Sequence, residues 1–279
     1  MKIYGLDFTS APGRQKPITG IEGTLKDNNT LHLQRDFKIA SLNEFEVFLK
    51  RRGPWIAGFD FPFGQPRPLI ENLGWPTAWA DYITQIAAMS QREFEEMIAA
   101  YRQTQPAGHK HLKRTTDIKA KAQSPMMLHG VPVGKMFFKG APRLLRSGVN
   151  ILPCHPTNED RIALEAYPAL VARKWLNKRS YKNDSPRKQT IDQEATRHDL
   201  VAALRSEALK QRYNIALNLS DGLTHHLLQD PSGDSLDALL CAIQAAWACT
   251  QQNYGIPATC DPLEGWIVDP EMTTQSYSK

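Results

Sequence analysis

The sequence predicts an α/β fold: a mixed sheet of three antiparallel strands followed by parallel strands, with helices on its flanks. Three observations predict it. Residues 1–9, 18–25 and 30–39 have extended patterns, and the polar cluster at 26–29 is a hairpin signal between the last two. Residues 55–64 are almost entirely apolar, as in a strand buried on both faces. Residues 161–167 alternate apolar and polar side chains, as a further strand does.

Helices are predicted where apolar residues recur at helical spacing. Two of them begin with a capping box, because Ser41 and Ser90 are each followed by a Glu three residues later. Gly53-Pro54 is the stop signal of the first. Residues 135–139 are either a strand or the start of a helix. The predicted helices span residues 42–52, 75–89, 90–105, 141–146, 169–177, 191–211, 223–229 and 233–247.

The chain length fits one domain, residues 1–279, with an insertion over residues 65–156 between the fourth and fifth predicted strands. The insertion is mostly helical and basic: residues 105–150 contain nine Lys or Arg side chains and one Asp. The net charge of the whole chain is only +5. Such asymmetry is typical of a protein that meets a polyanion, although runs of cations also occur simply as solvated loops.

The composition is that of an ordinary globular protein, with 41% hydrophobic and 23% charged residues. No apolar run approaches the roughly 18 residues of a membrane helix, and the N-terminus has no signal-peptide pattern. The four cysteines lack C-x-x-C spacing, which favours reduced thiols over a disulfide framework or a zinc site. We therefore expect a cytoplasmic protein without a membrane partner.

A carboxylate ends the first predicted strand. Asp7 follows apolar positions at Ile3 and Leu6 and precedes a turn over residues 9–13. Burying a charge costs several kcal/mol unless the charge is paired or binds a metal, and Asp is disfavoured inside strands. Asp7 therefore either accepts hydrogen bonds from the backbone of the turn or belongs to a cation site.

Asp60 repeats this placement at the end of a second apolar strand. Ligands of open sheets bind beyond the carboxyl ends of the strands, so neighbouring strands would bring Asp7 and Asp60 together. Glu165 lies near the end of the next predicted strand. Asp234 and Asp237, one helical turn apart, begin the last long helix. One explanation is that Asp234 is the N-cap and that Asp237 complements the helix dipole. However, Asp237 also borders the apolar face of this helix and is directed toward the same sheet edge as Asp7 and Asp60.

The loop predicted over residues 108–125 mixes cations with hydroxyl groups and lacks apolar periodicity. Such a loop can hold the phosphate backbone of a nucleic acid. His109 and His111 within it have no Cys or acidic partner at metal-ligand spacing, so phosphate contacts or solvation are favoured over zinc. The candidate nucleic-acid contacts are Lys110, Lys113, Arg114, Lys119 and Lys121.

The order of strands, insertion and closing helix is that of a ribonuclease H-like fold. The Asp234/Asp237 pair resembles Holliday-junction resolvases of the RuvC type. More closely, the chain resembles domain-of-unknown-function family 429 (DUF429), a group regarded as predicted ribonuclease H-like nucleases. The matching stretches are YGLDFTSAP (4–12), AGFDFPFG (57–64), ALEAYPAL (163–170), GDSLDALLCAIQA (233–245) and EGWI (264–267).

The resemblance implies a nuclease that hydrolyses phosphodiester bonds of DNA or RNA at a two-metal site. In-line attack develops charge on the entering and leaving oxygens, and two divalent ions about 4 Å apart can hold both. Mg²⁺ or Mn²⁺ is the expected cofactor, because Mg²⁺ prefers oxygen ligands. The expected catalytic residues are Asp7, Asp60, Glu165 and Asp237. The expected metal ligands are Asp7, which would bridge the ions, Asp60, Asp234 and Asp237.

Two other functions stay open at this point. The strand end Asp7-Phe8-Thr9-Ser10 also resembles the phosphate cradle of ATP-dependent phosphotransferases of the actin-like, sugar-kinase superfold. Against it, the second Gly-rich phosphate loop and a duplicated half are missing. The second open function is that of a nucleic-acid-binding module without catalysis. ATP binding would favour the former, and nucleic-acid binding without metal-dependent turnover the latter.

Overall fold

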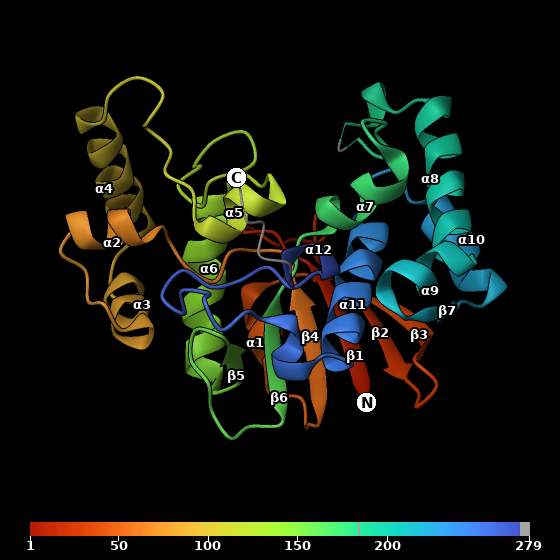
Figure 1. Ribbon diagram of the computed structural model, residues 1–279. Coiled ribbons are helices and arrows are strands. Elements are labelled where there is room, and N and C mark those ends of the chain that lie inside the picture. The colour runs from red at the N-terminus through yellow and green to blue at the C-terminus, as the bar shows by residue number, and fades with distance from the viewer. Residues whose placement is uncertain (184, 274–279) are drawn as a thin grey trace, which may run out of the picture.

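The computed structural model describes residues 1–183 and 185–273. Its strands form one mixed sheet of seven strands (Figure 1). They are β1 (Lys2–Asp7), β2 (Ile18–Leu25), β3 (Thr30–Ile39), β4 (Trp55–Phe59), β5 (Asn150–Leu152), β6 (Arg161–Glu165) and β7 (Ala216–Asn218). The sheet order is β5-β6-β4-β1-β2-β3-β7. β1, β2 and β3 are antiparallel neighbours, whereas β4, β6 and β5 continue the sheet in parallel. This order confirms the predicted ribonuclease H-like fold class.

Helices flank the sheet, and both predicted capping boxes begin a helix: Ser41 Oγ accepts from the Glu44 amide at 3.1 Å, and Ser90 Oγ from the Glu93 amide at 3.2 Å. Within the described residues no helix is both long and apolar enough to cross a membrane. The helices are α1 (Leu42–Leu49), α2 (Arg67–Asn72), α3 (Trp79–Ala87), α4 (Gln91–Thr104), α5 (Thr115–Ala120), α6 (Val133–Ser147), α7 (Pro168–Leu176), α8 (Ile191–Leu204), α9 (Glu207–Tyr213), α10 (Asp221–Gln229), α11 (Asp234–Cys249) and α12 (Pro270–Thr273), with 3-10 turns at Pro186–Lys188 and Gln252–Gly255.

Some predicted elements differ from the structure. The predicted helix over 191–211 is two helices, because Ser206 interrupts it and caps α9 by accepting from the Ala208 amide. The segment predicted as a loop over 108–125 contains α5, and residues 133–147 form the single helix α6. α2 and β7 were not predicted. Helices α2 to α6 lie between β4 and β5, in the part of the chain predicted as an insertion.

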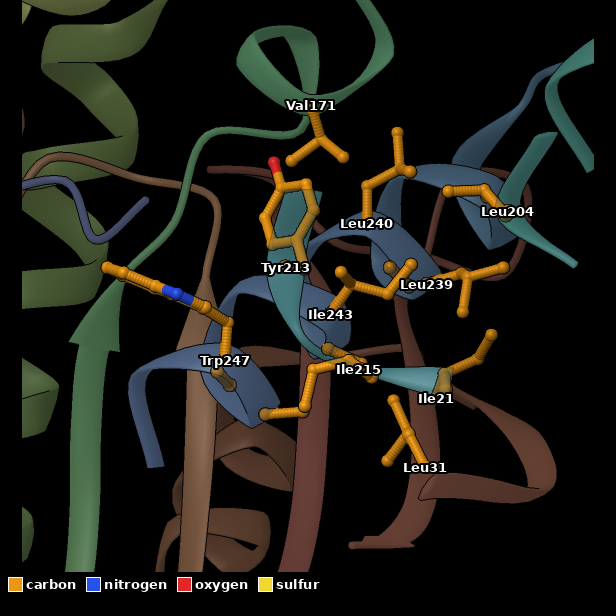
Figure 2. Close-up of a cluster of buried hydrophobic side chains, with 14 of the residues drawn as sticks. Ile21, Leu31, Val171, Leu204, Tyr213, Ile215, Leu239, Leu240, Ile243 and Trp247 are labelled. Atoms are coloured by element: carbon orange, nitrogen blue, oxygen red, sulfur yellow. The ribbon is translucent and has the colours of Figure 1, made fainter. Parts of the chain in front are cut away.

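The two faces of the sheet have separate hydrophobic cores, because side chains alternate along each strand. Tyr4, Leu6 and Phe8 pack with α1, α3, α4 and α6 on one face. On the other face, Ile3 and Ile21 belong to the core built around α11. Figure 2 shows this second core, in which side chains of α11 meet residues of β2, β3, α7, α8 and the end of α9. Its labelled members include Leu239, Leu240, Ile243 and Trp247 of α11.

α11 lies directly on β1 and β4 (Figure 1). Gly5 and Gly58 are paired across these two strands. A Cβ at Gly5 would lie 2.0 Å from the carbonyl oxygen of Ala238, and one at Gly58 would lie 2.5 Å from that of Cys241. Only glycine permits this approach. The helix backbone is therefore held against the sheet two residues before Asp7 and Asp60.

Candidate active site at the ends of β1 and β4

Three carboxylates meet where β1 and β4 end. Asp7 is the last residue of β1, and Asp60 follows β4, with its amide donating to the carbonyl of Leu6 at 3.0 Å. Residues two apart in a strand share a face, so Asp7 lies on the same face of β1 as Gly5, beneath α11. Asp237, in the first turn of α11, is buried with 2% of its surface exposed. The structure thus brings together the three aspartates that the sequence placed at this edge.

The negative charges of this cluster act on one another. Burial and the charge of Asp237 raise the pKa of Asp7 well above its usual value. The same causes raise the pKa of Asp60 to about 8. The pKa of Asp234 is raised too, by burial and by the neighbouring acids. Buried carboxyl groups whose pKa values are raised in this way are common in functional sites.

Lys182 is the cation that opposes this charge. Its Nζ contacts the Asp237 carboxylate, whose other oxygen accepts a hydrogen bond from the Tyr181 hydroxyl. The charge of Lys182 also lowers the pKa values of Asp7 and Asp60 against the effect of burial. In return, although burial alone would lower it, the pKa of Lys182 is raised by Asp237 and Asp7.

The segment between α7 and α8 holds Lys182 in this place. The backbone carbonyl of Lys182 accepts a hydrogen bond from Gln193 Nε2 at 3.0 Å, and the amide of Asn183 donates to the Pro231 carbonyl at 3.1 Å. Gly233 has a φ of 72°, and a Cβ there would lie 2.7 Å from the Cβ of Lys182. The aliphatic part of Lys182 thus packs on the start of α11. Tyr181 and Lys182 were not predicted as site residues, since a contact across 55 residues has no local signal.

The interpretation of Asp234 as an N-cap is wrong. Gly233 occupies the N-cap position, and the carboxylate of Asp230 accepts from the Ser235 amide at 2.9 Å. Asp230 also accepts from the Ser232 amide at 3.1 Å. Asp237 does lie in the first turn of α11, where an acid complements the helix dipole. Its side chain also contacts Lys182 and interacts with Asp7 and Asp60.

Glu165, predicted as catalytic, is part of a buried ion-pair network. Its Oε1 and Oε2 accept from Arg114 at 2.6 and 2.8 Å, and Oε2 also accepts from the Phe63 amide at 2.9 Å. Arg114 in turn binds Asp117 at 2.7 and 2.9 Å. Burial raises the pKa of Glu165, and Arg114 opposes that rise. Glu165 therefore secures the end of β6 beside the aspartates, and its oxygens are occupied by these donors.

Arg114 was predicted as a nucleic-acid contact on a loop, and this is wrong. Only 1% of its surface is exposed, and its guanidinium is bound to Asp117, Glu165 and the carbonyl of Glu264. Burial of a charge is stable only with such pairing. The other four predicted contacts stay predictions: Lys110, Lys113 and Lys121 are exposed, while half-buried Lys119 lies 5.4 Å above the Trp266 ring.

A cavity of about 320 Å³ adjoins the aspartates. Asp60, Asp237 and Lys182 line one part of it, and Arg114, Asp117 and Glu165 another. Most of the remaining wall is apolar and comes from the segments after β4, α5 and β6 and from the start of α6. The cavity and the carboxylates therefore form one site.

The carboxylates fit a hard divalent cation in donor type and in charge, since Mg²⁺ prefers oxygen ligands. In the side-chain arrangement seen here, no group of three acidic, His or Cys side chains among the described residues is placed to hold a metal ion. Asp237 is held by Tyr181 and Lys182 instead. A bound cation would offset the burial and the repulsion that raise the pKa values of Asp7 and Asp60, and it would compete with Lys182 for Asp237.

Comparison with known proteins identifies the family of the chain. Searches of curated proteins and of solved structures gave no significant match. The model of a family described as a protein of unknown function (DUF429) matches residues 19–260. This range includes Asp60, Glu165, Lys182 and Asp237, and Asp7 precedes it. Because the match covers most of its length, the chain belongs to the DUF429 family.

Proposed function

We propose that the protein is a metal-dependent nuclease that hydrolyses phosphodiester bonds at the cluster of Asp7, Asp60 and Asp237. The observation that carries the proposal is the gathering of these three carboxylates at the carboxyl ends of β1 and β4. One ammonium group, that of Lys182, contacts Asp237, and the raised pKa values of Asp7 and Asp60 leave these two carboxyl groups with protons that a bound cation can displace. A surplus of oxygen donors beside a cavity suits cation-assisted hydrolysis better than acid–base catalysis alone.

When bound, Mg²⁺ or Mn²⁺ would polarise the phosphate and favour the hydroxide form of an attacking water. Asp7, Asp60 and Asp237 would hold it, and Asp234, one turn before Asp237, would complete the set. Asp7 and Asp60 must be ionised to do so, which burial and the charge of Asp237 oppose in the free protein by raising their pKa values. Cation binding and loss of their protons are thus linked.

Glu165 supports this site without being a ligand in it. Its ion pair with Arg114 and its bond from the Phe63 amide fix the segment that follows Asp60. We therefore replace its predicted catalytic role with a positioning role. Lys182 would stabilise the cluster in the free protein through its contact with Asp237.

The test is cleavage of labelled DNA and RNA oligonucleotides by the full chain with Mg²⁺, Mn²⁺ or EDTA. We expect metal-dependent cleavage that falls by at least about 100-fold in Asp7→Asn and in Asp60→Asn, since each removes a ligand charge. Asp27→Asn, on the exposed β2–β3 turn, is the matched control and should cleave like the wild type. Turnover of ATP, or nucleic-acid binding without cleavage in either metal, would contradict the proposal.

A further inference from the structure

We propose that the cavity beside the aspartates binds one nucleobase of the substrate, so that cleavage occurs where a nucleotide is unpaired. This inference rests on the proposed nuclease function and adds a substrate class to it. Its starting observation is that Asp60, Asp237 and Lys182 belong both to the carboxylate cluster and to the cavity wall. A phosphate held at the cluster therefore places its attached nucleoside at the cavity.

The cavity is built for an uncharged, planar group. Its volume of about 320 Å³ is at the small end of ligand pockets. Phe61 and Pro62 after β4, Val133 and Met136 at the start of α6, and Tyr167 and Ile267 supply apolar surface. Arg173 lies 5.6 Å from the centre of the Tyr167 ring and restrains it. Aromatic and aliphatic walls of this kind stack well against a base, whatever its identity.

Charge excludes an anionic occupant. Asp60, Asp117, Glu165 and Asp237 all line the cavity. The guanidinium of Arg114 makes five hydrogen bonds within the protein, which is its full donor capacity. The ammonium of Lys182 is bound to Asp237. A phosphate would thus meet carboxylates without an uncommitted cation, whereas a neutral base would not.

The rim offers a polar contact for the edge of a base. Gln123 lines the cavity and is exposed, and its side-chain amide makes no hydrogen bond within the described residues. An amide presents both donors and an acceptor, so it can pair with more than one base. Val131, also at the cavity, is 60% exposed. The exposure of the apolar Val131 side chain at the rim is explained if the ring of a bound nucleobase covers it.

A base that enters this cavity must leave its stack. Extrusion from a perfect duplex costs free energy, and the cost is least for a mismatched or single-stranded base. The site should therefore prefer single strands, or duplexes with one unpaired nucleotide, over perfect duplexes. The preference should depend on the ring of that nucleotide and not on its phosphate.

The experiment compares four oligonucleotides of one sequence: a single strand, a perfect duplex, a duplex with one unpaired nucleotide, and that duplex with the unpaired base removed. Cleavage in Mn²⁺ should be at least about tenfold faster on the unpaired nucleotide than on the perfect duplex, reflecting the extrusion cost. Removing the base should abolish the advantage. Equal cleavage of all four would overturn the base site while leaving the nuclease function intact.

A second measurement does not need cleavage. In Ca²⁺, 2-aminopurine placed at the unpaired position should change its fluorescence on binding, and Val133→Trp, which fills the cavity, should suppress that change. Val47→Trp is the matched control, because Val47 is 69% exposed on α1. A fluorescence change without cleavage in any metal would support the base site and contradict the nuclease. Equal responses of both variants and the wild type would overturn the inference.

Discussion

Gly5 of β1 and Gly58 of β4 are paired across the two central parallel strands, and the backbone of α11 rests on both. Each glycine is followed two residues later by an aspartate, Asp7 or Asp60, so the sequence G-x-D occurs at both strand ends. The glycine admits the helix, and the aspartate, on the same face, meets the start of that helix. The close packing of α11 and the geometry of the carboxylate site therefore have one cause.

Replacing either glycine should destabilise the fold and displace the site. Gly5→Ala would put a Cβ 2.0 Å from the Ala238 carbonyl oxygen and 2.2 Å from the Ala242 nitrogen. Since both are backbone atoms, α11 must move, at a cost of about 3 kcal/mol. Urea denaturation measures the loss. Gly222→Ala in α10, where nothing lies within 4 Å, should be neutral or stabilising by up to about 1 kcal/mol. Equal effects of the two substitutions would contradict this account.

Local patterns in the sequence predict most of the fold. The strands 18–25 and 30–39 and both capping boxes follow from alternation and from Ser-x-x-Glu spacing, and the structure confirms them. The positions of Asp7 and Asp60 follow from the strand ends. These features depend only on residues near in the chain, so a single sequence contains their signal. The repeated G-x-D pattern was also present, and it indicates where a helix approaches two strands.

The partners of the site could not be predicted in this way. Arg114 binds Glu165 across 51 residues and Lys182 binds Asp237 across 55. In the sequence, both cations belong to basic stretches that are equally typical of solvated loops. Only the fold shows that Arg114 is buried. β7, three residues long, was missed because so short a strand has no period to detect.

The stability of the free protein should fall as the pH rises, through Asp60. Burial and Asp237 raise its pKa to about 8 in the folded state, while the unfolded chain keeps a value near 3.9. Between these values the folded state binds the extra proton, so this contribution to stability is full below about pH 4 and lost by about pH 8. Asp60→Asn should therefore gain stability over the wild type as the pH rises, by at least about 1 kcal/mol. Thermal melts at pH 5.5 and 8 check it.

A divalent cation should stabilise the wild type and not Asp7→Asn. Asn keeps the shape of the side chain but removes one charge, so the free variant should be no less stable than the wild type. A ligand stabilises only the state that binds it, and millimolar Mn²⁺ should raise the melting temperature of the wild type alone. Asp27→Asn should respond like the wild type. A wild type indifferent to Mn²⁺ at neutral pH would contradict the cation site.

Lys182→Met should weaken the free protein and strengthen its response to metal. Without the ammonium, Asp237, Asp7 and Asp60 lose the cation that opposes their repulsion. Because Lys182 is partly solvated, we expect a modest loss of about 1 kcal/mol in unfolding free energy at pH 7. Mn²⁺ should restore more than this loss, since it no longer competes with Lys182. Lys178→Met, an exposed lysine on the same segment, should do neither.

The ion pair of Arg114 should matter for stability rather than for nucleic-acid binding. Arg114→Met leaves Asp117 and Glu165 buried without their cation, which costs roughly 3–5 kcal/mol. Lys113→Met, at the exposed neighbour, should leave the unfolding free energy within about 0.5 kcal/mol. Urea denaturation separates the two. A folded Arg114→Met of unchanged stability would show that the network is not needed to hold β6.

The exposed lysines of the same stretch should govern the salt dependence of nucleic-acid binding. Replacing Lys110, Lys113 and Lys121 by Ala should weaken duplex binding and flatten the slope of log affinity against log salt by roughly 0.9 for each phosphate that the variant no longer neutralises. The control replaces Lys26, Lys50 and Arg52, three exposed cations beside the N-terminal ends of β1 and β4. That triple variant changes the net charge equally but at the opposite edge of the sheet from Asp7 and Asp60. If both variants flatten the slope alike, the cations act through net charge, and the insertion holds no phosphate.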